Sequence, residues 1–270
     1  MPGRFLIIDG YSQAGRDSLA GAGMDLAHAL YARMLTRWLP DAEWDVWMPS
    51  DDAQPPRGPR DYRAVLWTGS NLNVYDRGNP LVARQVDFAA AVRESRTPAF
   101  GSCWGLQVAL TAAGGEVTPN RRGREIGIAR QIHLTDAGRH HPMFAGKPVV
   151  FDNFASHVDH VAKLPSGVVI LAGNEFSPVQ AIEIGSFWGV QYHPEYDLHQ
   201  MARLLTSRKK ILLGEEFFCA EEELTAHVEK LEALHCQPCR KDLRWQLGIG
   251  DDVISADVRQ LEFRNWIQTI

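Results

Sequence analysis

Residues 98–115 read PAFGSCWGLQVALTAAGG, and this stretch predicts a short strand that turns directly into a helix. The turn is GSCWG, residues 101–105, with a glycine two residues to either side of Cys103. Such spacing suits a nucleophile elbow, a strained strand-to-helix turn whose small neighbours let backbone and substrate approach. The N-terminus of the following helix would present backbone N–H groups to a developing oxyanion. The plainer alternative is a buried core cysteine, the commonest fate of a free thiol.

The first half of the chain alternates strands with helices. Four short apolar runs predict buried strands, at residues 5–9, 44–48, 64–68 and 98–101, and two further stretches predict helices, at residues 24–39 and 80–94. We therefore expect an α/β fold, with an open, mostly parallel, flavodoxin-like sheet and helices on both of its faces. In such sheets the ligand crevice lies beyond the carboxyl ends of the strands, which directs attention to Gly10, residues 68–75 and Cys103.

The second half of the chain has a different texture. Residues 125–192 contain apolar runs separated by Gly, Pro, Asn and Asp, which predicts hairpins added to the sheet or beside it. Beyond Pro194 the pattern is helical, with helices expected at residues 197–213 and 220–235, a third between Pro238 and Gly248, and a fourth capped by Ser255. Residues 11–23 are expected to form a long loop over the crevice, either a substrate lid or a surface loop of no consequence.

Composition excludes several classes of partner. The 270 residues include 28 Lys+Arg and 33 Asp+Glu, for a formal net charge of −5, which argues against a nucleic-acid surface. The apolar run before Asp9 is too short for a signal peptide or a membrane span, so we expect no membrane partner and a cytoplasmic location. The chain has 4 cysteines, too few for a disulfide framework. Cys236 and Cys239 are interpreted as partly buried helix-end cysteines rather than a metal site, because zinc requires four ligands.

A second segment supplies what a reactive cysteine needs. Residues 188–197 read WGVQYHPEYD and end a predicted strand with His193 and Glu195 two positions apart. Alternate residues of a strand point the same way, so Glu195 can bond one imidazole nitrogen and orient the other. Pro194 cannot donate to a strand ladder, which places the segment at a strand end. Together with Cys103, this pair provides the base and the orienting group that activate a thiol.

These motifs resemble those of the triad, or class I, glutamine amidotransferases. That family has a G-x-C-x-G-x-Q elbow and a later H-P-E, which here are GSCWGLQ at residues 101–107 and residues 193–195. LWTGS at residues 66–70 is similar to the loop that carries the family's oxyanion-hole amide. SHVD at residues 156–159, followed by Leu-Pro, is similar to the corresponding segment of the GMP synthase amidotransferase domain. The resemblance extends over residues 4–205 in the family's order and spacing.

The resemblance implies a role for each matched residue. Cys103 would attack the side-chain amide of glutamine, and His193, oriented by Glu195, would protonate the departing ammonia and then activate water. Backbone amides would hold the oxyanion, from Trp104 and from either Gly69 or Ser70, and the two ends of the glutamine would be held by Gln107, Ser156 and His157. No metal and no organic cofactor is implied.

The same residues leave two functions open. The chain has no nucleotide-binding loop of the P-loop or pyrophosphatase type, so it cannot activate an acceptor with ATP. The main interpretation is a glutaminase subunit that hands ammonia to a separate synthetase. The alternative is a stand-alone γ-glutamyl hydrolase, peptidase or transferase acting on γ-glutamyl amides, amines or peptides. An inactive binding protein is disfavoured by the intact triad.

The length divides accordingly. We expect a class I amidotransferase-like domain at residues 1–205 and a helical C-terminal extension at residues 206–270. The amphipathic helices of the extension are candidates for a contact between copies in a homo-oligomer.

Overall fold

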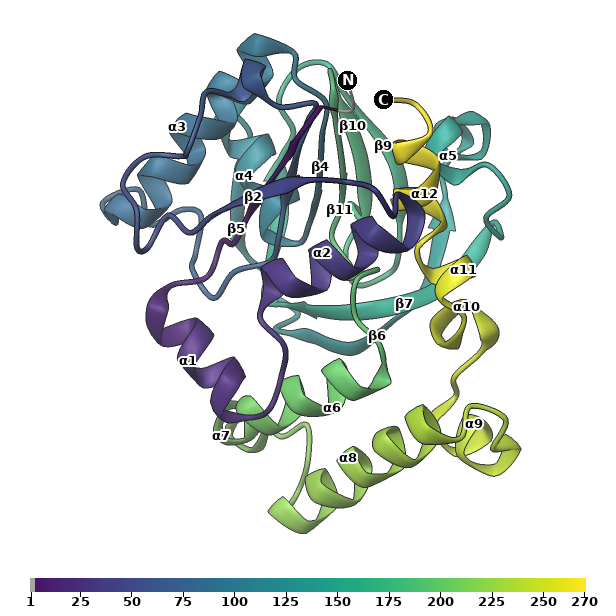
Figure 1. The fold of residues 1–270 in the computed structure, drawn as a ribbon. Coiled ribbons are helices and arrows are strands. Elements are labelled where there is room, and N and C mark those ends of the chain that lie inside the picture. The colour runs from purple at the N-terminus through teal and green to yellow at the C-terminus, as the bar shows by residue number, and fades with distance from the viewer. Residues whose placement is uncertain (1–2) are drawn as a thin grey trace.

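The computed structural model describes residues 3–270, and a mixed sheet of nine strands runs through its centre (Figure 1). Five neighbouring strands are parallel, in the order β2 (Trp44–Trp47), β1 (Phe5–Ile8), β3 (Ala64–Trp67), β4 (Ala99–Ser102) and β11 (Phe187–Val190). The expected α/β fold with a largely parallel core is therefore confirmed. Because these strands are parallel, all of them end at one edge of the sheet, the edge where ligands bind in such folds.

The rest of the sheet is antiparallel, as hairpins require. Beyond β11 the order continues with β10 (Ala181–Ile184), β9 (Val168–Gly173), β6 (Glu125–Leu134) and β7 (Val150–His157). A separate two-stranded sheet pairs β5 (Glu116–Pro119) with β8 (Asp159–Lys163). The β-rich texture of the second half thus extends the parallel sheet on one side.

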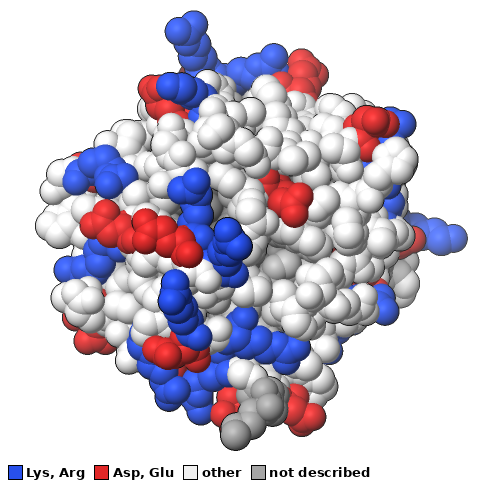
Figure 2. All heavy atoms as spheres, turned by 90° about the horizontal axis from the view of Figure 1, so that it is seen from above, with Lys and Arg blue, Asp and Glu red and all other residues white. Residues whose placement is uncertain are grey.

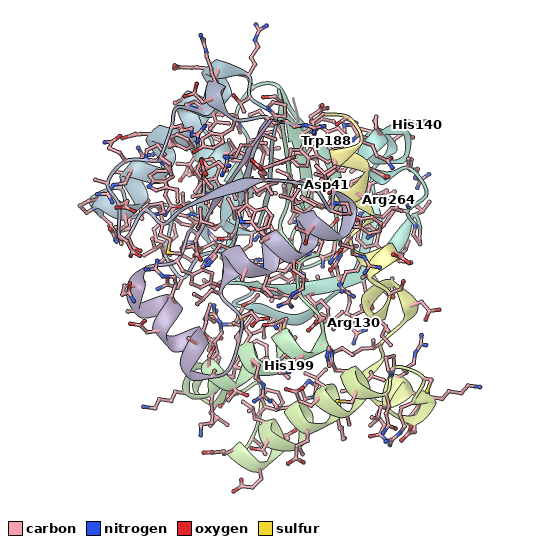
Figure 3. The ribbon with its side chains drawn as sticks, viewed as in Figure 1. Asp41, Arg130, His140, Trp188, His199 and Arg264 are labelled. Atoms are coloured by element: carbon pink, nitrogen blue, oxygen red, sulfur yellow. The ribbon has the colours of Figure 1, made fainter. Side chains whose placement is uncertain are left out.

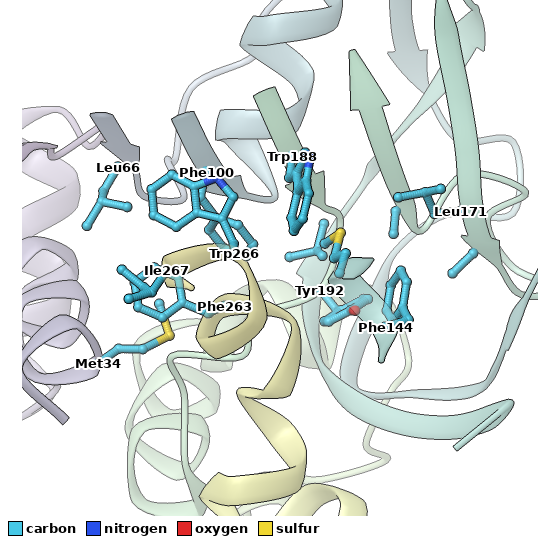
Figure 4. Packing of buried hydrophobic residues seen from close by; sticks show 14 of the residues in the cluster. Met34, Leu66, Phe100, Phe144, Leu171, Trp188, Tyr192, Phe263, Trp266 and Ile267 are labelled. Carbon is cyan, nitrogen blue, oxygen red and sulfur yellow. The ribbon is translucent and has the colours of Figure 1, made fainter. Parts of the chain in front are cut away.

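Helices cover both faces of the sheet. They include α2 (Ala27–Trp38), α3 (Pro80–Ser95), α4 (Trp104–Ala112) and α12 (Leu261–Ile267). Alternate residues of β1 belong to two different apolar clusters, one shared with α2 and α12 and the other with α3 and α4. Such double coverage explains why β1 is apolar without alternation. In the first cluster, Phe100 of β4 packs against Phe263 and Trp266 of α12 (Figure 4).

The chain beyond β11 is helical, as predicted, but in shorter pieces. It forms α6 (Leu198–Ser207), α7 (Lys209–Gly214), α8 (Glu221–Cys236), α9 (Lys241–Leu247), α10 (Asp251–Ile254), α11 (Ala256–Arg259) and α12. The single helix expected at residues 197–213 breaks at Arg208, where neither Gly nor Pro gives a sequence signal. His199 of α6 points toward α8, where its Nδ1 lies 2.8 Å from a carboxylate oxygen of Glu232 (Figure 3). The division at residues 205 and 206 stays a prediction.

The expectation of a loop at residues 11–23 is wrong, because this segment contains the helix α1 (Gln13–Gly21). Ser12 caps the helix by accepting a hydrogen bond from the backbone N–H of Gly15 at 3.1 Å. Arg16 is buried and pairs with Asp51 at 2.5 Å. Gly15 is there because a Cβ would lie within 2.3 Å of the Asn71 side chain. Tertiary contacts therefore hold a helix that the local composition disfavours.

The surface carries charges of both signs. Seen from above, Lys and Arg side chains lie beside Asp and Glu side chains on the left of that face and along its rim, and much of the rest is uncharged (Figure 2). No helix within residues 3–270 is long and apolar enough to cross a membrane. Shorter elements complete the fold, namely α5 (Asp136–His140) and the 3₁₀ turns η1 (Pro59–Asp61) and η2 (Pro142–Phe144).

Candidate active site

Cys103 occupies a strained turn between β4 and α4. Its backbone has φ +50° and ψ −99°, a region that residues other than glycine rarely adopt, and its side chain is buried. The backbone N–H of Cys103 donates to the carbonyl of Val190 in β11 at 2.7 Å, which fixes the turn. The two flanking glycines are needed for space: a Cβ on Gly105 would lie 2.7 Å from Cβ of Trp67. This is the geometry expected of a nucleophile elbow.

His193 and Glu195 follow β11 at the same edge of the sheet. Nδ1 of His193 lies 2.7 Å from Oε1 of Glu195, and both side chains are buried. The backbone N–H of His193 donates to the carbonyl of Phe154 at 2.7 Å, and its ring stacks on that of Tyr196 with 4.2 Å between centroids. Among the described residues, Nε2 of His193 has no hydrogen-bond partner. The second imidazole nitrogen is therefore left for a reacting group.

The charge of Glu195 sets the protonation of His193. Burial alone would lower the pKa of His193, but the negative charge of Glu195 and its hydrogen bond with the imidazole outweigh burial and raise this pKa above its ordinary value of 6.5. A raised pKa favours the protonated imidazole, which is the form that an acid needs to protonate a leaving amine.

A second donor supports the carboxylate, and the sequence analysis missed it. Oγ of Ser102 donates to Oε1 of Glu195 at 3.0 Å, and the hydroxyl of Tyr31 donates to Oγ of Ser102 at 2.7 Å. Tyr31 comes from α2 and is fully buried. The four side chains form one chain of hydrogen bonds, from α2 through β4 to the base, so Glu195 is held from two sides.

The loop after β3 lies against the same residues. A Cβ on Gly69 would lie 2.9 Å from Cε1 of His193, so the loop approaches the imidazole as closely as glycine allows. Oγ of Ser70 donates to the carbonyl of Gly10 at 2.8 Å and accepts from the backbone N–H of Leu72 at 3.0 Å. Trp104 is the first residue of α4, so its backbone N–H has no acceptor within the helix. The predicted oxyanion residues therefore flank Cys103 and His193, and the choice between Gly69 and Ser70 stays open.

A cavity of about 210 Å³ opens beside Cys103. Of the predicted site residues it is lined by Ser70, Cys103, Trp104, Gln107, Ser156 and His157. The thiol of Cys103 lies 3.8 Å from the carbonyl oxygen of Ser156, and Oγ of Ser156 has no partner among the described residues. His157 differs, because its two ring nitrogens contact Glu125 at 2.8 Å and the carbonyl of Asp159 at 2.9 Å. Both imidazole nitrogens of His157 are therefore occupied by contacts within the protein, which leaves neither of them for a substrate.

Besides Asn71, Leu72 and Asn73 of the loop after β3, five lining residues were not among the predicted site residues. They are Arg124, Val158, Asp159, Arg208 and Ile211. Arg208 and Ile211 come from the α6–α7 region, which reaches back to the cavity from beyond the expected domain limit. Asp159 closes the SHVD segment and is buried, and burial raises the pKa of its carboxyl. A sequence signal existed only for Val158 and Asp159, which belong to the SHVD motif.

The other cysteines lie away from this chemistry. Cys219, Cys236 and Cys239 are exposed, so the expectation that the helix-end pair is partly buried is wrong. The cause is the end of α8 at Cys236, after which the chain turns through solvent before α9. Within residues 3–270, no group of three or more His, Cys, Asp or Glu side chains is arranged to hold a metal ion.

Comparison with known proteins adds a family and a fold. Residues 60–211 match the family model described as glutamine amidotransferase class-I. A γ-glutamyl-L-1-hydroxyisopropylamide hydrolase of Pseudomonas sp is 33% identical over 276 residues, covering 98% of this chain and 92% of that protein. A glutamine-hydrolysing GMP synthase of Thermomicrobium roseum is 34% identical over 133 residues, covering 49% of this chain and only 23% of that protein.

Solved structures agree with the fold described above. A glutamine amidotransferase from Thermotoga maritima superposes with a TM-score of 0.71 at 18% identity, covering 100% of this chain and 98% of the other. A glutamine amidotransferase from Methylobacillus flagellatus superposes with a TM-score of 0.68 at 19% identity, covering 100% and 96%. Both likenesses extend through the C-terminal helices, so these helices are part of a shared architecture.

Proposed function

This chain belongs to the class I glutamine amidotransferase family and is a hydrolase of that family, and from this premise we propose that it cleaves γ-glutamyl amides without a partner enzyme. The main support is the relative of Pseudomonas sp, which is named as a γ-glutamyl amide hydrolase and whose match covers 98% of this chain. The match to GMP synthase covers 49% of this chain. The expectation of an ammonia-supplying subunit is therefore less well supported than its alternative.

The lining of the cavity supports the same proposal. Arg208 and Ile211 of the α6–α7 region line the cavity together with Cys103, so the C-terminal helices of the chain contribute to the cavity wall. A subunit that passes ammonia to another protein needs only a small exit, whereas an enzyme that releases a larger amine needs a wall that recognises it.

We propose that the reaction runs through a thioester on Cys103. The thiolate attacks the γ-amide carbonyl carbon, a C–S bond forms, and backbone N–H groups of Trp104 and of Gly69 or Ser70 bind the oxyanion. The intermediate collapses with cleavage of the C–N bond while His193 gives its proton to the leaving amine. His193, held by Glu195, then takes a proton from water that attacks the thioester, and C–S cleavage releases glutamate and restores the thiolate. Gln107, Ser156 and the His157 backbone are proposed to hold the γ-glutamyl group.

Purified protein tests this directly. It should release glutamate from γ-glutamyl ethylamide and from γ-glutamyl amino alcohols faster than from glutamine, with no partner added. Cys103→Ala should lose this turnover, whereas Cys239→Ala, which removes an exposed thiol, should retain it. If the protein hydrolysed glutamine but no γ-glutamyl amine, and did so only after a synthetase was added, the ammonia-supplying function would be established instead. Unchanged turnover by Cys103→Ala would refute the thioester route.

A further inference from the structure

One cation of the cavity wall has no ion-pair partner. Arg208 is half-buried, stands at the break between α6 and α7 and lines the cavity that contains Cys103. Its Nε is buried and has no hydrogen-bond partner, and within residues 3–270 no carboxylate forms an ion pair with its guanidinium. The neighbouring lining cation differs, since Arg124 makes two hydrogen bonds to Glu215, at 2.8 and 2.9 Å. The hydrogen bond from Arg124 lowers the pKa of Glu215, and the charge of Arg208 also lowers it, but Glu215 is bonded to Arg124. Arg208 is thus a cation at the cavity without a carboxylate bonded to it.

This arrangement is costly unless something fills it. A guanidinium stays charged at every physiological pH, and a buried donor without an acceptor loses its hydration without compensation. Its planar fork matches a carboxylate, which can accept two parallel hydrogen bonds. A polar group left unsatisfied inside a binding cavity therefore indicates a ligand group of the opposite charge.

Arg208 lines the same cavity as Cys103 and Trp104. Burial is the main cause that raises the pKa of the Tyr11 hydroxyl, and the positive charge of Arg208 opposes that rise.

We propose that Arg208 is the carboxylate anchor of this site, binding a carboxylate of the γ-glutamyl compound whose amide lies at Cys103. The inference rests on the proposed function and adds a substrate feature to it. Two carboxylates of such a compound have this chemistry: the α-carboxylate of the γ-glutamyl group, and a carboxylate on the leaving amine when the substrate is a γ-glutamyl amino acid. In both cases the anchor fixes the distance between the charge and the scissile amide.

Three substrates separate the two sources. γ-Glutamyl ethylamide carries only the α-carboxylate, γ-glutamylglycine carries a second carboxylate on the leaving amine, and N-ethyl-4-aminobutanamide carries none. Arg208→Gln should lower kcat/KM by about ten- to a hundredfold wherever the anchored carboxylate is present, and by less than twofold for the substrate without one. Loss with both γ-glutamyl substrates assigns the α-carboxylate, and loss with γ-glutamylglycine alone assigns the leaving amine. An equal loss with all three substrates, or no loss with any, overturns the anchor.

Two control variants test whether the loss of activity comes from losing the bond to the carboxylate. Lys210→Gln removes the same charge from an exposed position two residues away and should leave kcat/KM within twofold. Arg208→Lys keeps the charge without the fork and should fall between the wild type and Arg208→Gln.

A binding measurement separates failure of the anchor from failure of the proposed function. In the Cys103→Ala background, calorimetry should show that γ-glutamylglycine binds at least tenfold more weakly after Arg208→Gln, even if the natural reaction proves to be glutamine hydrolysis. Equal affinity of the two proteins for γ-glutamylglycine, with both folded by circular dichroism, refutes the anchor whatever reaction the enzyme performs.

Discussion

Replacing Ser102 by alanine should lower kcat/KM by about ten- to a hundredfold without unfolding the protein. Oγ of Ser102 donates to Oε1 of Glu195 at 3.0 Å, the same oxygen that lies 2.7 Å from Nδ1 of His193. Hydrogen bonds to a charged group contribute about 1.5–3 kcal/mol, and about 1.4 kcal/mol corresponds to tenfold in rate. Part of the loss is expected as a lower kcat, because Glu195 must be held in place while His193 exchanges its proton.

Tyr31→Phe provides a graded comparison. It removes the bond from the Tyr31 hydroxyl to Ser102, at 2.7 Å, and leaves the bond from Ser102 to Glu195 in place. This neutral bond contributes about 1 kcal/mol, so kcat/KM should fall about fivefold, less than for Ser102→Ala. Both variants are measured by glutamate release under single-substrate conditions across pH 5–10.

Ser186→Ala serves as the matched control, because it deletes a serine bond of 3.1 Å to the carbonyl of Thr97, away from the cavity. It should leave kcat/KM unchanged within twofold. If Ser102→Ala and Ser186→Ala had the same activity, Ser102 would have no positioning role, and the reasoning from the shared carboxylate oxygen would fail.

Three further predictions concern the space, the charge and the core around the site. Gly69→Ala should reduce kcat/KM at least tenfold, because its Cβ would lie 2.9 Å from Cε1 of His193, whereas Gly78→Ala, with its nearest neighbour at 3.9 Å, should keep full activity. The raised pKa of His193 means that its pair with Glu195 contributes stability fully below pH 6.5 and loses that contribution as the pH rises through the folded-state pKa. Glu195→Gln should reverse this trend, because burial then disfavours the charged imidazole. Denaturant unfolding of this variant should show that stability is lost as the pH falls below about 6.5. A pH dependence of stability equal to that of the wild type would contradict the role of the pair. Lys147→Met should cost about 3–5 kcal/mol in the free energy of unfolding, because it leaves the buried carboxylate of Glu262, 2.7 Å from Nζ of Lys147, without its counter-charge; a loss below 1 kcal/mol would contradict it.

Sequence patterns predicted the parallel strands and the elbow because both depend on local residue types. A strand covered on both faces has to be apolar at every position, and β1 and β3 are recognisable for that reason. The glycines around Cys103 are recognisable because larger residues would collide, as the 2.7 Å approach to Trp67 shows at Gly105. The spacing of these glycines was therefore enough to predict the elbow.

What the sequence did not predict depends on contacts between distant segments. Ser102 and Glu195 are 93 positions apart, and they meet because β4 and β11 are parallel neighbours with Ser102 opposite Val190. The helix α1 was missed because its Arg16 pairs with Asp51, which lies outside the helix and far along the chain. Arg208 was missed because it reaches the cavity through a helix break without Gly or Pro. In each case the role of the side chain depends on strand register and on packing between distant segments. The periodicity of apolar residues along the sequence gives no information on either.

The C-terminal helices connect these observations, because they contact the site at two separate points. Near their beginning, Arg208 lines the cavity, and near their end Nε of the buried Arg259 donates to the carbonyl of Pro194, between His193 and Glu195, at 3.3 Å. The last helix then packs in the core of the central sheet, where Trp266 is 1% exposed. The C-terminal helices therefore both line the cavity and support the His-Pro-Glu turn. This is the arrangement expected if, as we propose, the chain cleaves its γ-glutamyl substrate without a partner enzyme.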